Sequence, residues 1–278
     1  MADGLPRNAG SRGALGVVLT GGSRGLGLAM AQRFLAAGDA VVLCGRDASR
    51  LEVACADLAA RTDAGERLHA LACDVARLEE AARLGDFAVQ RLGTIHRWIN
   101  NAGTAGHHKR PLAELAASDI ATTCATNLTG SMQLCAEAVR RMGDQPAATE
   151  PHYHLFNFGF SGFGARFSRT SIPHRVSKLA VAELSRQLRH ELHKLGQRSI
   201  GVHELRPGLV RTELLLADLP AGAQPIVERM AEPPERVAEA LVPRIRGITG
   251  TGRVIQRHSK PLMLLRGVAA VAGGRRAR

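Results

Sequence analysis

The chain has 278 residues, of which 45% are hydrophobic, so it can bury the core of one large α/β domain, the arrangement we predict, or two small ones. One tryptophan and one tyrosine leave too few aromatic side chains to stack on bases, which argues against nucleic acid as a partner. Its 5 cysteines form no C-x-x-C pair, so they exclude a disulfide framework and favour a reducing compartment.

The positive charge is concentrated near the end of the chain. The net charge is +12, and from Arg244 onward there are nine arginines or lysines and no acid. The apolar stretch from Leu262 to Ala272 is too short to span a membrane and contains Arg266. We predict that this tail makes peripheral contact with an anionic membrane surface, with a solvated basic tail as the alternative.

Apolar runs alternate with helical patterns along the chain, which predicts a doubly wound, Rossmann-type α/β fold with about seven parallel strands and helices on both faces. Residues 1–13 are predicted to be a flexible segment, 14–258 a single domain and 259–278 the tail. About thirteen residues before the first strand are too few for a transit or signal peptide, so we expect that a targeting segment has been removed or never existed. The predicted strands are 15–20, 40–44, 68–73, 96–100, 153–158, 199–205 and 253–256, and the predicted helices are 25–37, 48–62, 76–92, 119–143, 173–195 and 233–246.

A glycine-rich stretch follows the first predicted strand. Gly21, Gly25 and Gly27 come after the apolar run that ends at Thr20, and a helical pattern follows them. Glycines allow a tight turn and a close approach to a ligand, whose phosphates then face the N-terminus of a helix. The pattern therefore predicts a dinucleotide site.

The second predicted strand ends where such a site reads the ribose. A site for the unphosphorylated cofactor places an acid there, but this chain has Gly45 followed by Arg46. Arg46 and Arg24 can offer planar donors to a 2′-phosphate, so we predict NADPH (or NADP) in preference to NAD. Asp47 is predicted to cap the following helix.

With Thr20, the glycine spacing G-x-x-x-G-x-G resembles the cofactor loop of the short-chain dehydrogenase/reductase family, and further motifs agree in order over about residues 14 to 258. They are Asp74 with Val75 after the third strand, the run Asn100, Asn101, Ala102 and Gly103 after the fourth, Asn127 in a helix, and Pro207 with Gly208 after the sixth. The resemblance implies an oxidoreductase with these cofactor-binding residues: Gly21, Ser23, Arg24, Gly25, Leu26, Gly27, Arg46, Asp74, Val75, Asn101, Ala102, Gly103, Lys178, Pro207, Gly208, Val210 and Thr212.

The resemblance fails at one catalytic position. The family uses a tyrosine four residues before a lysine and a serine thirteen residues before that tyrosine, and it implies Asn127, Ser161 and Lys178 in their usual roles. Position 174 is histidine, and Tyr153 cannot supply the motif because the residue four positions after it is Asn157 and not a lysine. Imidazole can donate a proton near neutral pH, so His174 is the expected acid. The alternative is an NADP(H)-binding homologue that has lost turnover and acts as a binding or regulatory partner.

Other stretches resemble the chlorophyll b reductase branch of the family, above all the run from Ala231 to Glu239, which lies outside the cofactor core. This branch implies reduction of the 7-formyl group of an apolar, chlorophyll b-like substrate to hydroxymethyl, in the chloroplast on the stromal side of the thylakoid. A general carbonyl or steroid-type reductase, or a cytoplasmic location, stays open. The segment 212–230 is the expected substrate lid, and helices 119–143 and 173–195 are the expected faces of a homo-oligomer.

The other histidines carry weaker expectations. His107 and His108 extend the loop after Gly103 and either touch substrate or belong to a solvated loop. His152 and His154 alternate on one strand with no third partner nearby in sequence. We therefore assign no metal.

Overall fold

The computed structural model of the chain describes residues 13–160, 165, 170–216, 227 and 230–257. Ser161, most of the expected lid and the basic tail lie outside these residues. The division into three segments and the membrane contact of the tail therefore stay predictions.

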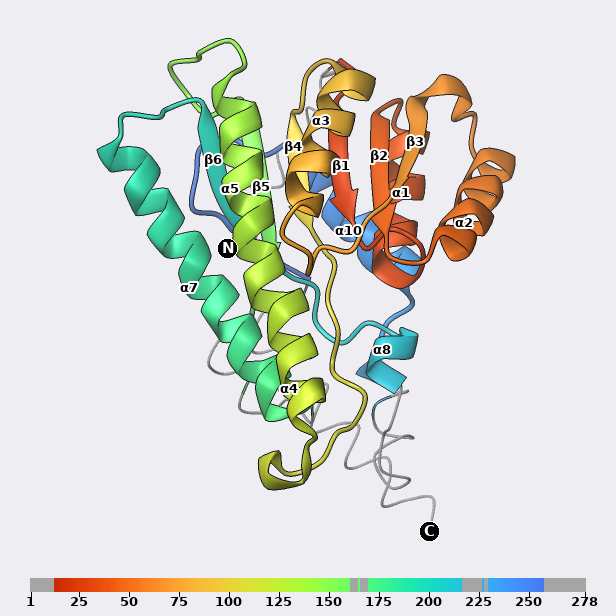
Figure 1. Cartoon of the computed structure of the whole chain (residues 1–278). Helices are drawn as coiled ribbons and strands as arrows, with labels where there is room; N and C mark the ends of the chain where they lie inside the picture. The colour runs from red at the N-terminus through yellow and green to blue at the C-terminus, as the bar shows by residue number, and fades with distance from the viewer. Residues whose placement is uncertain (1–12, 161–164, 166–169, 217–226, 228–229, 258–278) are drawn as a thin grey trace, which may run out of the picture.

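The described residues form one parallel sheet of seven strands in the order β3-β2-β1-β4-β5-β6-β7, and every neighbouring pair runs parallel (Figure 1). Strand β1 lies near the middle and pairs with both β2 and β4, so the chain reverses its direction of winding there. The predicted fold class is confirmed. The strands are β1 (Gly16–Thr20), β2 (Ala40–Gly45), β3 (Leu68–Ala72), β4 (Arg97–Asn100), β5 (Tyr153–Phe158), β6 (Ile200–Arg206) and β7 (Val254–Gln256).

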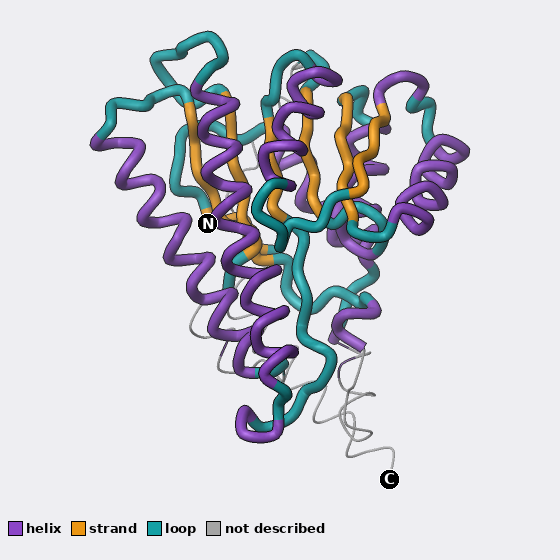
Figure 2. The backbone as a smooth tube through the Cα atoms, in the orientation of Figure 1, coloured by secondary structure: helices purple, strands orange, loops and turns teal. Residues whose placement is uncertain are grey.

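Helices cover both faces of the sheet (Figure 2). Buried side chains of α1, α2 and α10 form one core cluster with the sheet, and those of α3, α5 and α7 form the other. The helices are α1 (Gly25–Ala36), α2 (Ala48–Arg61), α3 (Glu80–Leu92), α4 (Ala117–Cys124), α5 (Gly130–Gly143), α7 (Ile172–Lys194), α8 (Glu213–Leu216) and α10 (Pro234–Arg246), with short 3₁₀ turns at Gly65–Arg67 and Leu112–Glu114.

Two predicted helices differ from the structure. The helix predicted at 76–92 begins only at Glu80, because Asp74 forms a turn in which its side chain accepts from the Ala76 amide at 3.1 Å. The helix predicted at 119–143 is instead α4 and α5 joined by a π-helical turn, Ala125–Thr129. Such turns occur frequently at functional sites, and this one contains Asn127.

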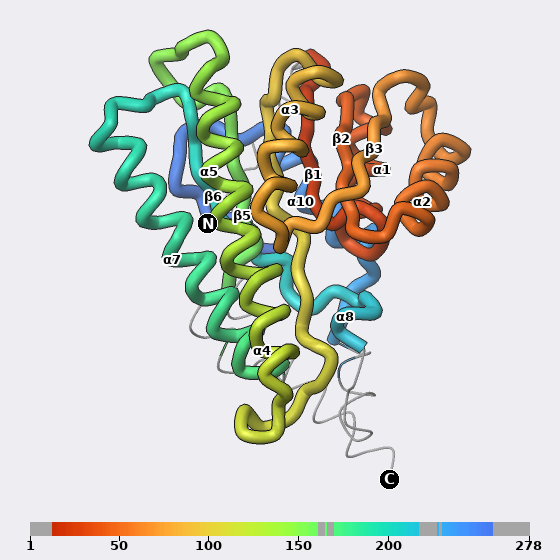
Figure 3. Tube along the Cα trace, viewed as in Figure 1, coloured from red at the N-terminus to blue at the C-terminus, as the bar shows by residue number. Residues whose placement is uncertain are grey.

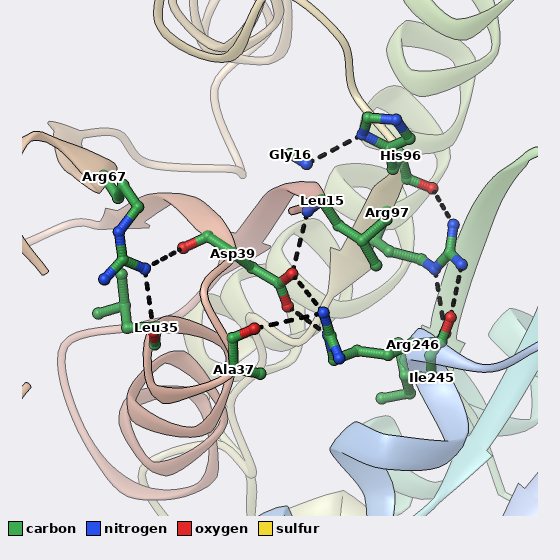
Figure 4. A network of polar contacts seen from close by, with 10 residues as sticks. All are labelled: Leu15, Gly16, Leu35, Ala37, Asp39, Arg67, His96, Arg97, Ile245 and Arg246. Carbon is green, nitrogen blue, oxygen red and sulfur yellow. Dashed lines mark hydrogen bonds and ion pairs between the residues drawn. The ribbon is translucent and has the colours of Figure 1, made fainter. Parts of the chain in front are cut away.

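Buried charges hold the amino edge of the sheet together (Figure 4). Asp39, which is 0% exposed, accepts from the Leu15 amide at 3.0 Å and from Arg246 Nε at 2.7 Å. Arg97, 2% exposed, donates to the carbonyls of Ile245 at 3.0 Å and Arg246 at 2.8 Å. These contacts tie the end of α10 to β4 and to the start of β2.

Candidate cofactor and active site

The glycine loop is fastened to the end of β4 at the carboxyl edge of the sheet. Asn101 donates from Nδ2 to the Thr20 carbonyl at 2.9 Å and to the Gly21 carbonyl at 3.0 Å. Gly21 has φ 68°, and a Cβ on Gly27 would lie 2.2 Å from the Gly21 oxygen, so neither position accepts a side chain without strain. The glycine loop and the Asn100–Gly103 run therefore pack tightly against each other at the carboxyl edge of the sheet.

The end of β2 packs against the glycine loop. A Cβ on Gly45 would lie 3.3 Å from Ser23 Oγ, and Arg46 is exposed. Asp47 accepts from the Arg50 amide at 3.0 Å, so its predicted role as the cap of α2 is confirmed.

The two predicted arginines at this end have different surroundings. Arg24 forms an ion pair with Glu213 of α8. Sequence reasoning missed Arg50, whose Nη1 lies 4.0 Å from the same carboxylate. Its place one helical turn after Arg46, in the helix that Asp47 caps, is the signal that could have found it.

The remaining cofactor candidates lie along the same edge. Val75 is buried and Asp74 half-buried. Gly208 has φ 78° after Pro207, Val210 forms a parallel bridge with Glu232, and a Cβ on Gly25 would lie 3.0 Å from Thr212 Cγ2. The segment after β6 therefore packs on the glycine loop. Leu26 lies in the first turn of α1, Ala102 packs against Gly21, and Gly103 lies beside Lys178.

The structure brings Asn127, His174 and Lys178 together. A Cβ on Gly103 would lie 3.2 Å from Asn127 Oδ1 and 3.3 Å from Lys178 Nζ. Asn127 Nδ2 lies 3.4 Å from His174 Nδ1. His174 and Lys178 are one turn apart on α7, and all three side chains are buried.

The Thr104 carbonyl determines which nitrogen of the neutral His174 ring carries the proton. Asn127 donates from Nδ2 to the Thr104 carbonyl at 2.8 Å and to Ser177 Oγ at 3.1 Å, which uses both of its amide hydrogens. His174 Nδ1 lies 2.7 Å from the same Thr104 carbonyl, which only accepts. We therefore assign the proton of the neutral ring to Nδ1, which leaves Nε2 as an acceptor.

Burial lowers the pKa of both His174 and Lys178 on α7. Desolvation, followed by the nearby charge of Lys178, lowers the pKa of His174 to about 4. Desolvation lowers the pKa of Lys178 to about 8. At pH 7 the histidine is therefore neutral and the lysine still carries its charge in most molecules. The ring at Nε2 can accept a proton from an alcohol, and it can donate one to an oxygen only after it has first become imidazolium.

Two neighbours of this cluster were not predicted. Ser177 links Asn127 to the His174 backbone, since its Oγ donates to the His174 carbonyl at 2.9 Å. The Phe160 ring packs edge-on against the His174 ring, with centroids 5.5 Å apart. Ser177 sits three residues after His174 in a helix, and that spacing is a signal for a shared face. The role implied for Ser161 falls outside the described residues.

The loop after β4 reaches α8. Asp119 accepts from the amides of His107 at 2.8 Å and His108 at 3.3 Å, while both side chains are exposed. Lys109 Nζ donates to the Leu215 carbonyl at 3.0 Å, so two segments far apart in sequence lie side by side below the sheet (Figure 3).

The strand histidines form a pair away from this edge. His154 Nδ1 lies 2.9 Å from His203 Nε2, and His152 packs its ring edge-on against Tyr153. Within the described part of the chain, no group of three or more histidines, cysteines or acids is placed to hold a metal ion. In the same residues, no helix has the length and apolar character needed to cross a membrane.

Comparison with known proteins places this geometry in a family. The family model for short chain dehydrogenases matches residues 16–219. The chain is 35% identical over 237 residues to the chlorophyll(ide) b reductase NOL of Arabidopsis thaliana, covering 85% of this chain and 66% of that protein. It is 32% identical over 267 residues to a probable chlorophyll(ide) b reductase of the same plant, covering 91% of this chain and 52% of that protein.

A solved structure agrees with the fold. A short chain dehydrogenase from Burkholderia cenocepacia J2315, in complex with NADP, superimposes with a TM-score of 0.70 at 26% identity, covering 87% of this chain and 96% of that one. The chain spans about two thirds of the first curated relative and about half of the second. The family model covers the glycine loop, Asn101 and Lys178 of α7. This protein is a member of the short-chain dehydrogenase/reductase family.

Proposed function

We propose that this protein uses NADPH to reduce a carbonyl group, and that its substrate is the 7-formyl group of chlorophyll(ide) b, which becomes hydroxymethyl. The substrate is supported by the names of the curated relatives, and NADPH by Arg24, Arg46 and Arg50 beside the end of β2. The chloroplast is the proposed location, because both relatives are named as chloroplastic.

The residues present fit the cofactor. Gly21 and Gly25, both with positive φ, form a tight turn before α1, and no side chain caps the N-terminus of this helix, so its first backbone amides could bind a phosphate. When bound, NADPH supplies the hydride. Lys178, charged at neutral pH, would hold the ribose hydroxyls of the bound cofactor, and Asn127 holds the loop at Thr104 against α7.

His174 supplies the proton in this proposal, and its geometry is the observation that supports it. The Nδ1 hydrogen is held by the Thr104 carbonyl, so the ring has a fixed orientation and Nε2 is the nitrogen left for substrate. A reduction needs the imidazolium, which delivers its Nε2 proton to the substrate oxygen and returns to the neutral form. With a pKa of about 4, that form is a small fraction at pH 7, so the reductase should be slow there and faster in acid.

The test is incubation of the protein with NADPH and chlorophyllide b, followed by the absorbance of the pigment. Conversion to the hydroxymethyl product supports the proposal. Reduction of small aldehydes or ketones without conversion of the pigment would instead identify a general carbonyl reductase. NADPH binding with no product from either substrate would identify the homologue without turnover.

A further inference from the structure

Glu213 opens α8, and its carboxylate contacts both guanidinium groups at the adenine end of the site. It forms an ion pair with Arg24, and its Oε2 lies 4.0 Å from Arg50 Nη1. Arg24 lies in the glycine loop just before α1, while Arg50 lies in the first turn of α2. One carboxylate from a distant part of the chain thus bridges two elements of the cofactor site.

This carboxylate contacts two of the three arginines that the proposed function assigns to the 2′-phosphate. The ribose is read at the end of β2, where Gly45 packs under Ser23, the neighbour of Arg24. Carboxylates and phosphates use the same planar donors of arginine. A phosphate that arrives beside Glu213 would also be repelled by it, so the two anions compete for Arg24 and Arg50.

The segment that carries Glu213 also contacts the glycine loop and the loop after β4. Thr212 packs against Gly25, since a Cβ there would lie 3.0 Å from Thr212 Cγ2. Lys109, in the loop after β4, donates to the Leu215 carbonyl at 3.0 Å. A movement of α8 that withdraws Glu213 would therefore change contacts of this loop.

We propose that Glu213 is an internal competitor of the cofactor's 2′-phosphate. In the free protein its carboxylate holds Arg24 and Arg50, and NADPH displaces it on binding. NADH has no phosphate at this position, so it does not need the displacement. The inference rests on the proposed use of NADPH and adds a residue that weakens this preference.

The experiment compares NADPH and NADH titrations of the full chain and of Glu213→Gln by calorimetry. Because Glu213 is 71% exposed and surface ion pairs are weak, we expect NADPH to bind about twofold to fivefold more tightly to the variant, with NADH unchanged. The gain should shrink at high salt, where exposed charges are screened. In an Arg24→Met background, Glu213→Gln should give a smaller gain, since its main partner is already gone.

A matched control is Glu239→Gln. Glu239 is also exposed and pairs with an arginine, Arg33, at 2.9 Å, but this pair joins α1 and α10 away from the glycine loop. The control should change neither titration. NADPH preference without a gain in Glu213→Gln would overturn this inference alone. Weaker NADH binding by that variant would overturn it too, because Glu213 would then hold the ribose hydroxyl. If the unmodified protein binds neither cofactor, the proposed function is refuted and this inference with it.

Discussion

Two clusters of buried polar side chains, one at each edge of the sheet, differ in what surrounds their charge. At the amino edge, Asp39 and Arg97 are matched with an opposite charge or with carbonyl oxygens, as Figure 4 shows. At the carboxyl edge, burial lowers the pKa of His174 and Lys178, and desolvation is the largest cause in both. Buried charge alone therefore does not indicate a reactive site. Burial that favours the neutral form of a group, next to a ligand-binding loop, does.

The largest effect should come from breaking the carboxyl edge at His174. If this residue is the acid, His174→Ala should lower the turnover of a formyl substrate by about 10²–10⁴-fold, the range for a lost general acid. His174→Tyr, which restores the spacing of the family's tyrosine and lysine, should raise turnover at neutral pH. Single-turnover absorbance measurements with saturating NADPH would check both.

An alanine variant as active as the unmodified protein would exclude the acid role. The proton would then come from water relayed through Asn127 and Lys178. Equal inactivity of the two proteins, with NADPH bound to each, would instead support the homologue without turnover.

Removing a buried charge at the amino edge should lower the free energy of unfolding and leave cofactor binding unchanged. Arg97→Met would leave the carbonyls of Ile245 and Arg246 without their buried donor, at an expected cost of about 1–3 kcal/mol for each carbonyl in the free energy of unfolding. Arg61→Met is the control, since Arg61 forms an exposed pair with Asp57 and its loss should cost about 1 kcal/mol or less. Urea unfolding measures both. A loss of NADPH affinity in folded Arg97→Met would contradict the separation of the two edges.

The pH dependence of the reduction rate tests whether His174, with its lowered pKa, is the proton donor. Its pKa is lowered, so the imidazolium that donates the proton becomes scarcer as pH rises above about 4. Reduction should therefore fall about tenfold for each pH unit between roughly 5.5 and 7.5, while oxidation of the product alcohol, which uses the neutral ring, should not. In His174→Tyr this slope should disappear. A reduction rate that is flat over this range would be incompatible with a donor of such low pKa.

The smallest effect concerns the exposed charges around the cofactor. Arg46→Asp should reverse the preference from NADPH to NADH, since it replaces a donor for the 2′-phosphate by an acceptor for the ribose hydroxyl. A charge-assisted hydrogen bond suggests a change of about tenfold or more in the ratio of affinities. Equal titration curves for the two cofactors in the unmodified protein would remove the basis of this prediction.

Most of the fold could be predicted from the chain itself, because buried parallel strands and amphipathic helices leave strong periodic patterns. All seven strands lie within two residues of their predicted bounds. The late start of α3 could not be predicted, because the Asp74 turn competes with the helix for the same residues and its outcome depends on tertiary packing. The π-helical turn depends equally on contacts that the periodicity does not contain.

The candidate site, like the fold, could be predicted only in part from the sequence. The spacing of His174 and Lys178 on one helix places them together, and the glycine pattern places the cofactor loop. The bond from His174 to the Thr104 carbonyl could not be predicted, since it joins α7 to a loop 70 residues earlier and involves no side chain of that loop. The same holds for Glu213, which reaches Arg24 across 189 residues of sequence.

The π-helical turn between α4 and α5 lets one continuous helical segment serve both the candidate site and the core. One extra residue per turn rotates everything after Thr129 by about 100° relative to an uninterrupted α-helix. Asn127 can therefore face the site while Leu134, Cys135 and Ala138 face the core. The turn fixes the rotation of α4 relative to α5. The loss of a single residue from Ala125–Thr129 would therefore rotate one helix against the other and move Asn127 away from its partners on α7.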